Sequence, residues 1–163
     1  MGMGPGQWGP LIAELRLEWP DTDEDRLCAL GDLWAGLDGK LRGEVGTADG
    51  RLREMILGSQ GQSVAAVGAA WTAPQAPSTN LEHGATAATL VALGLYACAG
   101  VVIALKSNFA VQLAALDSQI KWAEDNATRT DGASLDQIPE FKADAVQNIN
   151  QLVAEAERAI MDD

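Results

Sequence analysis

The side chains in this sequence that are able to take part in proton transfer or nucleophilic attack form no recognisable catalytic set. The one histidine, His83, stands beside Glu82. A histidine next to a carboxylate can act as a general base, but in the expected first turn of a helix a surface or capping histidine is the commoner case. The sequence has no Gly-rich phosphate loop and no nucleophile beside a base. We therefore expect no enzyme, no catalytic residue and no cofactor.

Four carboxylates cluster just after Pro20, at Asp21, Asp23, Glu24 and Asp25. Carboxylates bind Ca²⁺, but a calcium loop also needs a spaced glycine and a distal glutamate, which are missing here. Acidic residues are favourable at the positive end of a helix dipole. We expect this cluster to begin a long helix and predict no metal site.

The two cysteines, Cys28 and Cys98, have neither a CxxC spacing nor a histidine nearby. The sequence therefore predicts no zinc site and no disulfide framework. Two alternatives remain for this pair: each is a buried free thiol, or the two form a bridge between neighbouring helices.

The chain has 163 residues and a net charge of −12, and its acidic residues lie mainly in 11–54 and 124–163. Between residues 59 and 122 only Glu82 and Asp117 are acidic. An acidic surface repels phosphate backbones and anionic headgroups, which argues against nucleic-acid binding and electrostatic docking to lipid. The opening residues have no basic or apolar region typical of a signal peptide, so we expect no export by the general secretory route.

The central stretch, residues 79–124, is expected to form one long helix, with Thr79 and Glu82 as its capping box. Its first half, residues 84–105, carries no charge. Large side chains recur there at helical spacing and predict one inward-facing stripe. The stripe comprises Val91, Leu95, Cys98, Val102, Leu105, Phe109, Leu113, Leu116 and Ile120.

Two environments would suit this uncharged run: the interior of a helical bundle, or a bilayer, which about 20 apolar residues can cross. The run is rich in Ala, Gly and Thr, and no Lys or Arg cluster flanks it. Because the amphipathic continuation needs partner helices, we favour the bundle, with membrane contact through 84–105 as the alternative.

The expected fold is all-α: one elongated helical bundle built on a long antiparallel helical hairpin, with short accessory helices. Turn chemistry predicts six segments. They are a flexible arm (1–9), N-terminal helices (10–58), a turn, short helix and proline-containing loop (59–78), a long central helix (79–125), a loop (126–134) and a C-terminal helix (135–163). A break at Asp49 and Gly50 would divide the long N-terminal helix in two.

Tryptophans are the rigid anchors available to such a bundle. Trp8 and Trp19 precede the main helices, where they either pin the arm or face a partner. Trp34 and Trp71 are more typical of a core, and Trp71 is kept as a third candidate for partner contact.

Three stretches resemble the opening of the WXG-like domain found at the N-terminus of large actinobacterial secreted toxins. They are GPLIAEL at 9–15, WPDTDEDRL at 19–27 and LGDLW at 30–34. The order of helix, Gly-containing turn and helix is similar to that of WXG-type substrates of type VII (ESX) secretion. This likeness implies an export-targeting module, which in that family is normally fused to a C-terminal toxin.

The export turn would fall at Ser59, Gln60 and Gly61, where serine replaces the expected tryptophan and only the glycine matches. The family's second signal, a tyrosine followed four residues later by an acidic residue, is absent because Tyr96 is followed by Gly100. The resemblance implies secretion without a signal peptide, with the type VII machinery and a helical protein or a second copy as partners. A membrane-inserting or pore-associated helical protein is the alternative.

Overall fold

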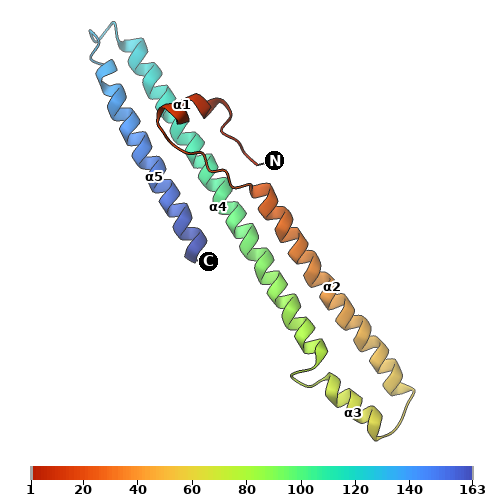
Figure 1. The fold of residues 1–163 in the computed structure, drawn as a ribbon. Coiled ribbons are helices and arrows are strands. Elements are labelled where there is room, and N and C mark those ends of the chain that lie inside the picture. Colours follow the sequence, from red (N-terminus) through yellow and green to blue (C-terminus); the bar gives the residue numbers. More distant parts are fainter. Residues whose placement is uncertain (1, 163) are drawn as a thin grey trace. The chain divides into compact units, whose positions relative to one another are not determined.

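The computed structural model describes residues 2–162, and every regular element in that range is a helix. Figure 1 shows the helices in chain order. They are η1 (Gly6–Trp8), α1 (Gly9–Glu14), α2 (Glu24–Leu57), α3 (Gln62–Trp71), α4 (Pro77–Asn126), η2 (Leu135–Gln137) and α5 (Ile138–Asp162). The all-α prediction is confirmed. The long N-terminal helix runs unbroken through Asp49 and Gly50, so the alternative of two helices is wrong.

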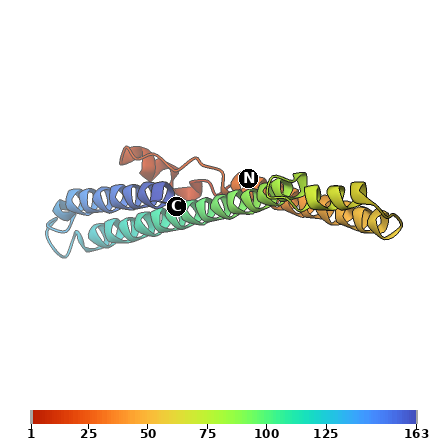
Figure 2. The same cartoon turned by 90° about the horizontal axis from the view of Figure 1, so that it is seen from below.

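The chain divides into two compact units, each with its own packing. The α2–α4 unit is Leu27–Tyr96, and the α4–α5 unit comprises the described residues up to Arg26 together with those from Ala97 onward. Helix α4 is continuous and contributes its first part to one unit and the rest to the other. In the α4–α5 unit, α5 runs beside α4 in both views (Figures 1 and 2).

Helices α2 and α4 form an antiparallel pair within the α2–α4 unit. A Cβ atom placed on Gly31 would lie 2.7 Å from the ring of Tyr96, and one on Gly84 would lie 3.6 Å from Leu41. The first contact pairs the start of α2 with a late residue of this part of α4, and the second pairs residues further on with earlier ones. The predicted antiparallel hairpin is therefore present in this unit.

The buried residues of α4 recur in steps of three, four and seven, the heptad spacing of helices that pack at a small angle. They change in size along the helix: those before residue 100 are alanines, and those after it, except Ala123, are larger side chains. This seam consists of Ala85, Ala88, Ala92, Ala99, Val102, Lys106, Phe109, Leu113, Leu116 and Ala123. Small residues let two helix backbones approach closely, and the larger ones fill the wider core of the α4–α5 unit.

The beginning of α4 differs from the prediction. The helix starts at Pro77, a residue well suited to a first helical turn. The Thr79 hydroxyl donates to the carbonyl of Ala73 at 3.3 Å, and the Ser78 hydroxyl donates to the carbonyl of Trp71 at 2.9 Å. The predicted capping box is wrong because Thr79 lies inside the helix and its hydroxyl binds a carbonyl of the loop before α4.

The expected flexible arm is also held in place over its described part. The amide of Met3 donates to Glu24 Oε1 at 2.5 Å, and Trp8 packs against the core of the α4–α5 unit. Residue 1 lies outside the described residues. At the other end of α4 the predicted loop is present, closed by Ser134, whose hydroxyl donates to the carbonyl of Ala123 at 2.6 Å.

Candidate interaction surfaces

An uncovered apolar surface lies on α2 in the α2–α4 unit. Leu30, Leu33 and Leu37 are exposed, Leu33 to 70%. With Trp34 they line a shallow groove of about 300 Å³ that has no polar side chain in its wall. Soluble proteins rarely leave contiguous apolar surface uncovered unless it serves an interaction. This groove is the clearest candidate for a docking surface.

Helix α4 leaves apolar side chains uncovered in the same unit. Leu90 is 65% exposed, and Val91 and Leu93 are exposed as well. The antiparallel register brings Leu90 to about the level of Leu37, so both helices of the pair present uncovered apolar residues at this height.

The predicted stripe on α4 follows the buried seam only in part. Val102 and Phe109 are buried, while Leu95, Cys98 and Leu105 are half-buried. Val91, however, is 41% exposed, and the neighbouring Ala92 takes the buried position. The prediction assigns the largest side chains to the buried face. The close contact between α2 and α4 instead buries alanines and leaves the larger residues exposed.

Helix α4 is also the one helix in residues 2–162 that is long and apolar enough to cross a membrane. Its most apolar stretch has a mean hydropathy of 2.3, and 22% of that stretch is buried. The expectation that neighbouring helices cover the uncharged run holds on one side of α4 only.

Charge is divided unevenly between the two units. The α2–α4 unit contains six acidic and four basic residues, a net charge of −2 out of the −12 of the whole chain. The unit with the uncovered apolar groove is therefore close to neutral, and almost all the excess negative charge lies in the α4–α5 unit. Electrostatic repulsion between two α2–α4 units would be small.

The proposed export turn links α2 to α3. Gly61 has φ of 136°, a conformation that L-residues with a side chain rarely adopt, so glycine is required there. Ser59, Gln60 and Gly61 are exposed, and no residue of α3 is buried. Trp71 anchors α3 instead, because its ring N–H donates to Asp49 on α2 at 2.5 Å.

Two of the three tryptophans expected as partner contacts pack inside the α4–α5 unit. Trp19 meets Phe109 edge to face, with ring centroids 5.2 Å apart, and its ring N–H donates to the carbonyl of Met3 at 3.1 Å. Trp8 lies against the same core. The structure uses both side chains to hold the N-terminal segment.

The residues with possible chemistry stay apart. His83 is exposed, the two cysteines are free and half-buried, and residues 2–162 contain no group of three or more potential metal ligands. In the carboxylate cluster, Asp23 Oδ1 accepts from the amides of Asp25 and Arg26 at 3.1 and 3.2 Å, as expected at a helix start.

Sequence reasoning missed one polar centre, a buried ion pair between Lys106 and Glu24. Lys106 is 2% exposed, and its Nζ lies 2.6 Å from Glu24 Oε2 and donates to the carbonyl of Thr22 at 2.7 Å. This ammonium, and after it the amide of Met3, holds the pKa of Glu24 at about 2, below its ordinary value of 4.5. Lys106 is the only basic residue between Arg53 and Lys121, apart from His83. The isolation of this lysine is the one feature of the sequence that could have indicated a buried charge.

No protein-family model matches this chain, and neither a curated protein nor a solved structure matches it. The candidate surfaces are therefore judged on their own chemistry.

Proposed function

We propose that this chain is a non-catalytic domain that acts by helix packing, as the export-targeting and interaction module of a type VII secretion substrate or toxin system. The observation that carries the proposal is the uncovered groove of Leu30, Leu33, Trp34 and Leu37 on a nearly neutral helical hairpin. A surface of this kind suits another helical hairpin better than a small polar ligand.

The energetics favour a helical partner. Fully burying an exposed leucine contributes about 1.5 to 3 kcal/mol, whereas association costs about 4 to 15 kcal/mol in lost freedom. Covering several exposed residues on both α2 and α4 at once reaches that range. The partner we propose is a second copy, because two units of net charge −2 repel each other little.

The secretion part of the proposal is supported by sequence stretches 9–15, 19–27 and 30–34, and by the turn at Gly61 with its positive φ. Export is tested by fractionation. Deleting the type VII secretion ATPase should remove the protein from the culture supernatant without lowering its level in the cell. Unchanged release would contradict the secretion assignment.

The surface is tested with two matched variants. Leu33→Glu puts a charge in the groove, whereas Leu57→Glu makes the same change at a residue that is 87% exposed but lies at the end of α2. Both should keep the circular dichroism of the parent. Only Leu33→Glu should reduce association and export, and equal effects of the two would contradict the groove as an interface.

A second candidate function is membrane insertion through residues 84–105. It is favoured by the high mean hydropathy of α4 and the small buried share of its most apolar stretch. It predicts that the protein resists carbonate extraction and floats with vesicles of neutral phosphatidylcholine. Full recovery in the aqueous fraction would exclude it and leave the packing role.

A further inference from the structure

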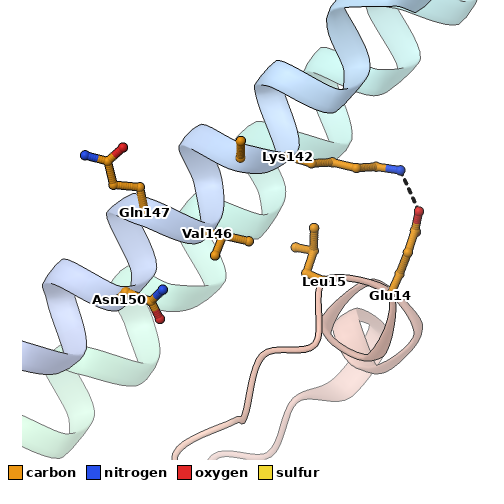
Figure 3. A pocket seen from close by; sticks show the side chains of 7 residues that line it. Glu14, Leu15, Lys142, Val146, Gln147 and Asn150 are labelled. Carbon is orange, nitrogen blue, oxygen red and sulfur yellow. Dashed lines mark hydrogen bonds and ion pairs between the residues drawn. The ribbon is translucent and has the colours of Figure 1, made fainter.

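The N-terminal segment, residues 2–15, is held in the α4–α5 unit by apolar packing, one ion pair and hydrogen bonds to the backbone of Met3. Ile12 joins the buried cluster with Phe109, Leu113 and Ile149. Leu11 and Leu15 pack against that cluster from the same segment. On the outside, Lys142 Nζ of α5 donates to Glu14 Oε1 at 2.5 Å (Figure 3).

The site that receives this segment, called its seat below, is formed by residues outside the segment: Trp19, Glu24, Lys106, Phe109 and Lys142. Lys106 holds Glu24 through Oε2, which leaves Oε1 to accept the amide of Met3. Trp19, packed on Phe109, offers its ring N–H to the carbonyl of Met3. Residues 2–15 therefore bind to a hydrogen-bond acceptor on Glu24, a hydrogen-bond donor on Trp19 and an apolar surface around Phe109.

The connection between the segment and its seat is strained. Arg16, directly after the segment, has φ of 54°, in the left-handed region that disfavours a residue with a Cβ. The amide of Leu17 reaches back to the carbonyl of Ile12 at 3.1 Å to close this turn. Opening the chain at Arg16 relieves the strain, a condition that promotes exchange of segments between copies.

The segment is also open to water along one side. A groove of about 610 Å³ runs beside α1 on the surface of α5 (Figure 3). Its wall consists of Glu14, Leu15, Lys142, Ala143, Val146, Gln147 and Asn150. A short helix bordered by solvent opens at lower free energy than the core beneath it.

We propose that residues 2–15 detach from the seat in their own chain, and that the vacated seat binds residues 2–15 of a second copy. The occupant follows from the chemistry of the seat. It must place a carboxylate at Lys142, a free amide and carbonyl between Glu24 and Trp19, and an apolar side chain over Phe109. A second copy carries all of these at the required spacing. This surface differs from the α2–α4 groove, so the two are tested separately.

The native ion pair gives a direct test with the full, unaltered chain. Equal amounts of ¹⁵N-labelled and unlabelled protein are incubated at high concentration and treated with a carbodiimide, which joins carboxylates to lysines in contact. Exchange should raise the mixed-label share of Glu14 to Lys142 cross-links toward about one half. Cross-links of Asp117 to Lys121, within α4 at 2.6 Å, must stay single-label and serve as the internal control. Single-label Glu14 to Lys142 links at every concentration would overturn the proposal.

A charge swap provides a second, independent measurement. Glu14→Lys and Lys142→Glu each place like charges together within their own chain, but in an exchanged pair of the two variants both contacts are attractive. Mixing them should produce a dimer by light scattering that neither variant forms alone to the same extent. Equal monomer content before and after mixing would count against the exchange, whatever the outcome for Leu33→Glu.

Discussion

Tyr96 of α4 lies directly on Gly31 of α2, so that a Cβ atom at the glycine would be 2.7 Å from Cε1 of the ring. The Tyr96 hydroxyl donates to Asp32 Oδ1 at 2.6 Å. One contact thus fixes both the distance and the register of the two helices.

Replacing Gly31 with alanine should destabilise the protein by about 1 to 3 kcal/mol, because the new methyl group overlaps the Tyr96 ring. Gly39→Ala is the matched control on the same helix, with nothing within 4 Å of its Cβ position. Alanine has the higher helix propensity, so Gly39→Ala should stabilise by up to about 1 kcal/mol. Urea unfolding measures both, and changes of the same sign would contradict the contact.

The hydroxyl of Tyr96 should titrate above its ordinary pKa of 10.0, because Asp32 accepts its proton and burial disfavours the phenolate. Tyr96 is the only tyrosine in the chain, so its ultraviolet titration is unambiguous. Asp32→Asn should move the pKa of Tyr96 back down. An unchanged titration curve in that variant would show that Asp32 is not the cause.

Glu24 should make stability depend on pH in the acid range. Its pKa is about 2 in the folded chain against 4.5 ordinarily, so the stabilisation is complete above about pH 5 and is lost as the pH falls toward 2. Wild type should be more stable than Glu24→Gln at pH 7, and this difference should shrink between pH 5 and pH 2. We would measure unfolding free energies of both proteins across that range. A constant difference would contradict the ion pair.

Phe109 should be the most costly side chain to remove from the α4–α5 unit, since it is fully buried between Trp19 and Ile12. Phe109→Ala should cost about 3 to 5 kcal/mol. Val111→Ala, two residues away and 62% exposed, should change stability by less than about 0.5 kcal/mol. Thermal unfolding of the two variants distinguishes core from surface on the same turn of α4.

Helix order was predictable because local signals were strong. Pro20 and the carboxylates placed the start of α2, and Gly61 marked the turn before α3. The orientation of α4 before residue 100 was not predictable. The large side chain of Val91 suggested that this residue faces inward, whereas the close contact between α2 and α4 buries Ala92 instead. The partner of a buried charge is set by tertiary contact, so sequence could not pair Lys106 with Glu24, 82 residues away.

The central claim is that the uncovered groove on the α2–α4 unit is an interface with another helical hairpin. Sedimentation equilibrium of the full chain in detergent-free buffer tests it most directly. The account predicts that wild type and Leu57→Glu associate equally, while Leu33→Glu associates clearly more weakly than both, with an unchanged helical spectrum. A wild-type protein that remains monomeric at high concentration, or a Leu33→Glu variant that associates as well as wild type, would contradict it.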